Sequence, residues 1–267
     1  HVLFVITGMA ILLALIPVGL TTSAAPAPLA EVKLRLRRLY KMSPVGILGC
    51  FFVGMANGAY GGLGAVFAQK LGFSLFEVAL FMSVSLIGGA LAQIPIGRLS
   101  DRMDRRRVMV GVCVFAAVAG LILAITGGIG INSTPFSNLS PIILIGIAGG
   151  LGFFIYPMYS LCVAHTNDFI SAQDFVEASS GLLLTFGIGA SIGPLIASLL
   201  MQSIGPGALF AFTAVVHSSF LLFTLYRMTR RAPIPTEERE NFVQAGTPRT
   251  TPAIVAMDPR APDTPTN

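Results

Sequence analysis

The chain has 267 residues, of which 54% are hydrophobic and only 11% are charged, and its mean hydropathy is +0.80. A water-soluble globular domain carries about a quarter charged residues, so this composition excludes that class. The net charge of +5 could indicate a nucleic-acid partner, but the basic residues flank apolar blocks, so we expect no nucleic acid as a partner.

The apolar residues fall in seven blocks, and no block contains an Asp, Glu, Lys or Arg. Each block is long enough to cross the hydrocarbon core of a bilayer as a helix, which takes about 20 residues. Because lipid leaves no water to satisfy an open sheet edge, the sequence predicts an all-α polytopic membrane protein with about seven transmembrane helices. The blocks comprise residues 2–20, 45–67, 78–96, 108–129, 141–164, 180–201 and 207–226.

The chain order predicts four parts. Residues 1–20 begin directly in an apolar run without a basic segment, so we expect them to be the last helix of a truncated N-terminal half. Residues 21–44, with an Ala/Pro stretch and a basic run, are expected to form a cytoplasmic interdomain linker. Residues 45–228 are expected to form a C-terminal six-helix transmembrane domain, and residues 229–267 a disordered tail rich in Pro and Thr.

The connectors between the blocks carry the 17 Lys and Arg residues very unequally. If the blocks alternate across the membrane, 16 of these residues fall on one side and only Lys70 falls on the other. This strong positive-inside pattern predicts that the linker and the tail are cytoplasmic. We expect the protein to lie in a cell membrane, the bacterial inner membrane, with the lipid bilayer as a partner.

The connector after the third block, residues 97–107, holds seven charges in eleven residues. A glycine at its start, Gly97, lets two helices approach closely, and Arg105 lies within reach of Asp101. Asp101 can also sit against the positive N-terminal end of a neighbouring helix. A solvated loop that only sets the topology is the alternative interpretation.

The order of these residues resembles the cytoplasmic loop signature of the major facilitator superfamily, Gly-x-x-x-Asp-Arg-x-Gly-Arg-Arg. The resemblance implies a conformational latch that holds the cytoplasmic side closed. Asp104 stands where the family usually has a glycine, which puts the tight turn there in question. The matching residues are Gly97, Asp101, Arg102, Arg105 and Arg106.

Other segments are similar to the same family. Gly193-Pro194, with Gly189 four residues earlier, resembles the Gly-Pro motif of the family's fifth helix. Tyr156-Pro157 and the run 164–168 look most like the YcaD-type branch of bacterial transporters. The resemblance implies a secondary active transporter of a small solute that works by alternating access. It also implies that the missing N-terminal helical half is a partner of this chain.

Two glycine-rich segments, residues 54–64 and 149–160, each open a unit of three blocks. Helical transporters bind their substrates on interrupted helices at corresponding positions of internal repeats, so we expect polar groups of these segments to line a substrate cavity. In the superfamily the corresponding helices line the central cavity, as the resemblance implies. Close helix packing by the glycines and interfacial anchoring by the tyrosines are the alternatives. The expected cavity residues are Asn57, Tyr60, Tyr156, Tyr159 and Ser160.

The remaining ionisable residues favour structural roles. Ser74 and Glu77 have the spacing of a capping box at the start of the third block. His217 is expected to pack with a hydrogen bond, with a proton relay as the alternative, and His165 to make a boundary contact. The three cysteines stand singly in three blocks, so we expect packing residues, with no metal site and no cofactor.

Three other classes of membrane protein compete with a transporter. A seven-helix retinal protein would need a Lys within a block for its Schiff base, and no block has one. A membrane-embedded enzyme would need a catalytic cluster, whereas the blocks supply one histidine and isolated thiols, so we expect no enzyme. A channel is disfavoured because no charged ring or repeated filter sequence is present.

Overall fold

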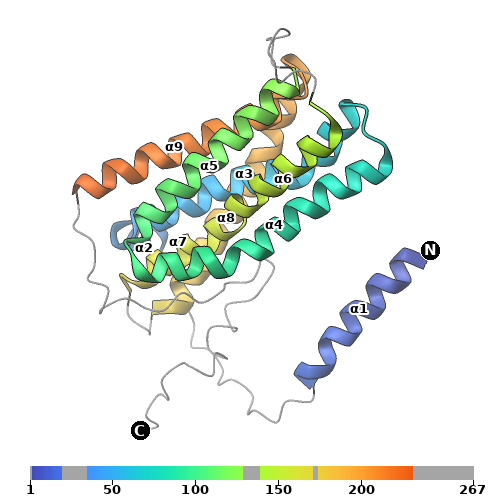
Figure 1. Cartoon of the computed structure of the whole chain (residues 1–267). Helices are drawn as coiled ribbons and strands as arrows, with labels where there is room; N and C mark the ends of the chain where they lie inside the picture. The colour runs from blue at the N-terminus through green and yellow to red at the C-terminus, as the bar shows by residue number, and fades with distance from the viewer. Residues whose placement is uncertain (1, 20–34, 129–138, 171–173, 231–267) are drawn as a thin grey trace. The chain divides into compact units, whose positions relative to one another are not determined.

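The computed structural model describes residues 2–19, 35–128, 139–170 and 174–230, which contain helices and no strand (Figure 1). Six spans in this part of the chain are long and apolar enough to cross a membrane. The predicted all-α polytopic fold is therefore confirmed. The helices are α1 (Val2–Gly19), α2 (Leu36–Met42), α3 (Pro44–Lys70), α4 (Leu75–Arg102), α5 (Arg105–Thr126), α6 (Pro141–Ile155), α7 (Pro157–Asn167), α8 (Phe175–Ser203) and α9 (Ala208–Arg230).

The helix α1 and the bundle of α2 to α9 belong to two separate compact parts of the chain. Within α1, the residues from Phe4 to Ile16 form an apolar helix whose side chains are all exposed. The expected linker, residues 21–44, contains the helix α2 and the first residue of α3, and its residues 21–34 lie outside the described residues. The expected tail from residue 231 onward lies outside them as well.

Local chemistry sets where the helices begin. Ser43 caps α3 by accepting a hydrogen bond from the Gly46 amide, and Pro44 takes the first helical position, where no amide hydrogen is needed. Ser74 and Glu77 form the predicted capping box, because the Ser74 hydroxyl accepts from the Glu77 amide and the Glu77 carboxylate accepts from the Ser74 amide. Pro157 divides the fifth block into α6 and α7.

The bundle consists of two units of three spans, α3 to α5 and α6 to α9, and its largest contacts follow this division. The first span of each unit packs against the second span of the other, so that α3 packs on α8 and α6 packs on α4. The third spans, α5 and α9, pack against each other. This exchange of partners gives the bundle the internal repeat that the two glycine-rich segments indicated.

Glycines form both of the crossings between the units. In α3 and α8, a Cβ added at Gly54 would overlap the Phe186 carbonyl, and one added at Gly189 would overlap the Phe51 carbonyl. In α4 and α6, a Cβ at Gly152 would overlap the Ser85 carbonyl. The absence of side chains therefore brings the helix backbones into direct contact, as in other tightly crossed membrane helices.

Two apolar clusters fill the interior, and large apolar side chains also cover much of the exterior. The first cluster holds aromatic rings such as Phe67 and Phe210, whose centroids lie 4.6 Å apart. The second holds the three cysteines, all buried and free. Leu91, on the outside of α4, is 67% exposed and Leu222, on α9, is 64% exposed, which is expected for surfaces that face lipid.

Candidate functional site

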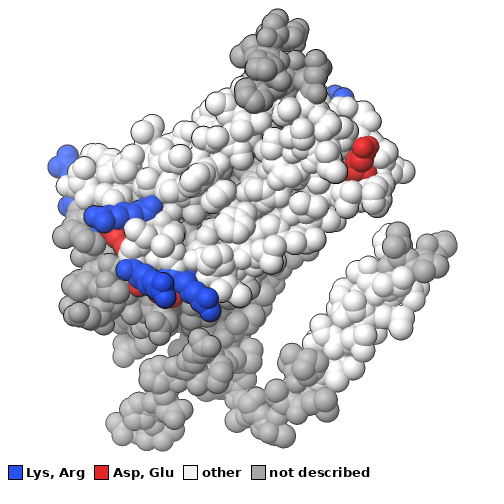
Figure 2. Space-filling model, in the orientation of Figure 1, with Lys and Arg blue, Asp and Glu red and all other residues white. Residues whose placement is uncertain are grey.

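Charged side chains gather mainly at one end of the bundle, where α9 ends and the connector between α4 and α5 lies (Figure 2). The centre of this group is Arg105, the first residue of α5, whose side chain is only 1% exposed. Its Nε donates to Asp168 Oδ2 over 2.9 Å, and its Nη1 donates to Asp101 Oδ1 over 3.2 Å. The same Nη1 donates to the Ser100 hydroxyl over 2.9 Å.

The sequence predicted the proximity of Arg105 to Asp101 but not the pairing with Asp168. Asp168 follows α7, which belongs to the other three-span unit, and its side chain is 4% exposed. Arg105 therefore connects the two three-span units at the end of the bundle that the sequence predicts to be cytoplasmic. Because 63 residues separate Asp168 from Arg105, no local spacing connects them. The sequence offered one signal for this pairing, the presence of an acidic residue soon after the fifth block.

Arg106 pairs with Asp104, two residues before it in the chain. Its Nη2 lies 2.8 Å from Asp104 Oδ2, and the Asp104 carboxylate also accepts from the Arg106 amide over 3.0 Å, which caps α5. Asp104 has a φ of −56°, so this position does not require the glycine of the family signature. Burial raises the pKa of the Asp104 carboxyl, but the hydrogen bonds and charge of Arg106 outweigh it and lower the pKa overall.

The other two residues of the expected latch lie outside these ion pairs. Gly97 is buried in α4, one turn before Asp101. Arg102, in the last turn of α4, is exposed. The structure thus brings Asp101 and Arg105 together, and it places Arg106 in a neighbouring pair.

A second cluster of polar groups is buried in the interior, where α3, α4 and the junction of α6 and α7 meet. Tyr60 is 1% exposed, and its ring packs beside those of Phe81 and Phe210, at centroid distances of 6.2 and 5.8 Å. Ser85 is fully buried, and its hydroxyl lies close to the phenols of Tyr60 and Tyr156. Three of the expected cavity residues, Asn57 among them, belong to the helices that meet here.

Hydrogen bonding in this cluster is incomplete. Among the described residues, the buried Asn57 Oδ1 has no hydrogen-bond partner, and the hydroxyls of Tyr60 and Ser85, although near each other, make no hydrogen bond of good geometry. Polar groups in a protein interior are nearly always paired, so three unpaired oxygens are unusual. Sequence reasoning missed Ser85, because a single serine in an apolar block gives no signal until the crossing with Gly152 is known.

The other expected cavity residues follow Tyr156 along α7. Tyr159 and Ser160 are buried in α7, and the Tyr159 ring contacts Phe186 edge to face at a centroid distance of 5.2 Å. His217 is buried in α9 with its Nδ1 2.7 Å from the Thr213 carbonyl oxygen, which is the hydrogen bond expected for a packing role. The His165 ring packs on Phe169. Within the described chain, no three His, Cys, Asp or Glu residues are placed to hold a metal ion.

A bundle of six spans with apolar exteriors and charges at its ends defines a polytopic helical membrane protein. The family model described as Major Facilitator Superfamily matches residues 1–166 and, in an overlapping match, residues 46–257. The chain therefore belongs to the major facilitator superfamily.

Curated relatives agree with this assignment. The uncharacterized MFS-type transporters YcaD of Salmonella paratyphi B, Salmonella typhi and Salmonella arizonae are each 29% identical to the chain over 241 residues. These alignments cover 88% of this chain and 58% of the relative. The chain thus spans somewhat more than half the length of the relatives it matches. No solved structure matches the chain.

Proposed function

We propose that this chain forms one half of a secondary active transporter that moves a small solute by alternating access. Membership of the superfamily supports a transporter, and the relatives carry that description. The observation that carries the proposal is the group of Tyr60, Ser85 and Tyr156 in the interior, with the unpaired Asn57 Oδ1 three residues before Tyr60 on α3. Leaving a buried polar group unpaired costs about 1–3 kcal/mol, and polar groups at membrane depth are typical of solute pathways.

In this proposal the cluster forms one wall of the solute site. Asn57, Tyr60, Ser85 and Tyr156 offer hydroxyl and amide groups, which bind a polar solute by hydrogen bonds. Phe81 and Phe210 pack against the Tyr60 ring, which is buried in the described conformation. The helices therefore have to move before a solute reaches its phenol. Tyr159 and Ser160 would extend the wall along α7.

The opposite wall belongs to a second six-helix half. The length of the relatives, of which the chain spans 58%, supports such a half. We place α1 as its last helix, residues 21–44 as the connection between the halves, and residues 45–228 as the half that is present. Alternating access then consists of the two halves rocking against each other around the fixed solute site.

The Arg105 group would act as the cytoplasmic latch of this half. The excess of Lys and Arg at this end supports a cytoplasmic orientation, in a bacterial inner membrane, with the tail on the same side. Asp101 is the member that can reach outward, because its side chain is 34% exposed. In the complete transporter, Asp101→Asn should lower transport and leave membrane insertion unchanged, and unchanged transport would reduce the loop to a topological signal.

The solute site is tested by uptake into proteoliposomes that contain the complete transporter, with a solute found by screening. Tyr60→Phe and Asn57→Ala each remove one hydrogen-bonding group and should raise KM about three- to tenfold. Tyr226→Phe is the matched control, because Tyr226 is 52% exposed at the far end of α9 and should leave KM unchanged. An unchanged KM for both cluster variants would contradict the proposed site.

A further inference from the structure

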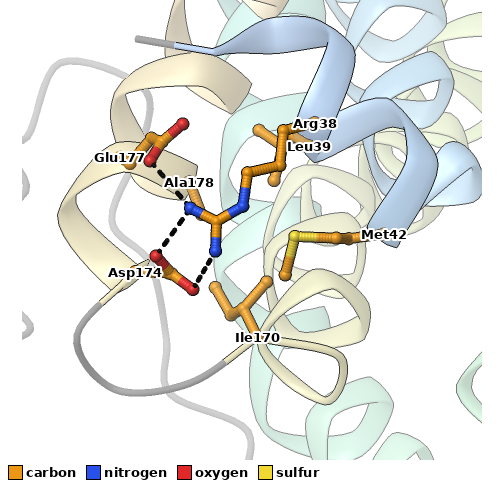
Figure 3. Close-up of a pocket in the computed structure, with 7 residues that line it drawn as sticks. All are labelled: Arg38, Leu39, Met42, Ile170, Asp174, Glu177 and Ala178. Carbon is orange, nitrogen blue, oxygen red and sulfur yellow. Dashed lines mark hydrogen bonds and ion pairs between the residues drawn. The ribbon is translucent and has the colours of Figure 1, made fainter. Parts of the chain in front are cut away.

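Arg38 fastens the short helix α2 to the start of α8 (Figure 3). Its Nη1 and Nη2 donate to the two carboxylate oxygens of Asp174 over 3.1 and 3.0 Å, and Nη1 also donates to Glu177 Oε2 over 3.4 Å. The other oxygen of Glu177 accepts from the Arg35 amide over 3.1 Å. Asp174 thus binds the guanidinium in a bidentate arrangement, the strongest geometry for such pairs, and Glu177 adds a single contact.

Apolar contacts lie directly beneath these ion pairs. Leu39, the next residue of α2, is 4% exposed, and Ala178 in the first turns of α8 is 1% exposed. Both line the hollow drawn in Figure 3, together with Met42 and Ile170. The charged contact and the apolar contact therefore hold the same two helices together, and the guanidinium covers the hollow.

The position of α2 gives this contact a mechanical consequence. Only Ser43 separates α2 from α3, so fastening α2 to α8 also fastens the start of α3 to the start of α8. These two long helices cross deeper in the bundle, where Gly54 and Gly189 make direct backbone contacts. The direct contacts of this crossing extend to Gly58 with Ala190 and Gly193 with Met55. The attachment through α2 lies beyond them, at the starts of the two helices, and it restricts any change in their crossing angle further.

The lever arms show how sensitive the attachment is. Ten residues of α3 and fourteen residues of α8 separate the crossing from the helix starts, which corresponds to arms of about 15 and 21 Å. A change of about 10° in the crossing angle would shift the two helix ends by about 3 Å relative to each other. That movement exceeds what hydrogen bonds of 3.0–3.4 Å tolerate, so the pairs with Asp174 and Glu177 have to break first.

We propose that Arg38 is a clamp that fixes the angle between α3 and α8, so that their ends separate only when its ion pairs with Asp174 and Glu177 open. The clamp makes α2 an integral part of the six-helix bundle. It concerns the rigidity of the bundle itself and does not depend on the proposed transport of a solute.

A cysteine beneath the guanidinium reports on the clamp. Ala178→Cys places a thiol in the buried hollow of the purified chain, and its rate of modification by a maleimide is read by mass spectrometry at that residue. Arg38→Ala should raise this rate about tenfold, because the hollow then opens more often. Arg37→Ala is the matched control, since Arg37 is the exposed neighbour on the same helix and should leave the rate unchanged. Asp174→Asn should reproduce the effect of Arg38→Ala.

The three natural cysteines are buried and serve as internal reporters of unfolding. Equal rates at residue 178 in the Arg38→Ala and Arg37→Ala proteins, with the natural cysteines still protected, would overturn the clamp. If Arg38→Ala also exposes the natural cysteines, Arg38→Lys decides, because it keeps the charge and loses the bidentate geometry. An intermediate rate then supports the clamp, and the wild-type rate refutes it.

Discussion

Asp168→Asn should destabilise the bundle more than any other single neutralisation at its charged end. The change removes the negative charge that lies 2.9 Å from Arg105 Nε. The Arg105 side chain, which is only 1% exposed, then keeps its positive charge without this buried partner. Breaking a buried ion pair by removing one partner costs about 3–5 kcal/mol. Arg105 keeps its bonds to Asp101 and Ser100, so we expect the lower end, about 3 kcal/mol.

Asp101→Asn is the matched control for this prediction. It removes a carboxylate from the same guanidinium, but the Asp101 side chain is 34% exposed, so the expected cost is only about 0–1 kcal/mol. A double variant, Arg105→Met with Asp168→Leu, removes both charges of the buried pair. It should lose less stability than Asp168→Asn alone, because no buried charge remains unpaired.

The chain contains its own reporters for the assay. Its three cysteines are buried and free, so a thiol-reactive dye follows thermal unfolding of the purified protein in detergent. A cost of 3 kcal/mol corresponds to a fall in Tm of about 6–12 °C for a chain of this size. An equal or larger fall for Asp101→Asn would refute the assignment of Asp168 as the main partner of Arg105.

Three further predictions test the packing, the cap and the topology. Gly189→Ala should cost about 1–3 kcal/mol because its Cβ meets the facing backbone of α3, whereas Gly187→Ala, with open space around it, should change the free energy of unfolding by less than about 1 kcal/mol. Because the pKa of Asp104 is lowered in the folded protein, its contribution to stability is full above the usual Asp pKa of about 4 and is lost as the pH falls below it. Asp104→Asn should therefore flatten the dependence of Tm on pH in that window. An unchanged slope would contradict the pairing with Arg106. In whole cells, Lys70→Cys should react with an impermeant thiol reagent added outside and Arg102→Cys should not, both positions being exposed; the reverse pattern would overturn the orientation.

Features that depend on neighbouring residues were predictable from the sequence. The six spans follow from uncharged apolar runs of bilayer length, and the capping box follows from the three-residue spacing of Ser74 and Glu77. The pairing of Arg105 with Asp101 follows from their separation by four residues across the short connector between α4 and α5. In each case the distance along the chain determines the distance in space.

Features that depend on how helices cross were not predictable in the same way. The contact of Arg105 with Asp168 needs the end of α7 to lie beside the start of α5, and the place of Ser85 needs the close crossing with Gly152. The basic run before the second block was expected to be a linker, and nothing in its local pattern indicated that Arg38 binds Asp174. Glycine positions suggest that helices cross closely, but they do not say which helices or at what angle.

Solute flux tests most directly whether this chain is one half of a transporter. Residues 1–267 are reconstituted into proteoliposomes alone, and in parallel after co-expression with the part of the preceding half that lies upstream of α1. Both preparations are first shown to contain inserted, folded protein, which is expected because each helix satisfies its own backbone. We predict no flux for the chain alone and solute flux for the pair. Flux catalysed by the chain alone, as a monomer, would contradict the account.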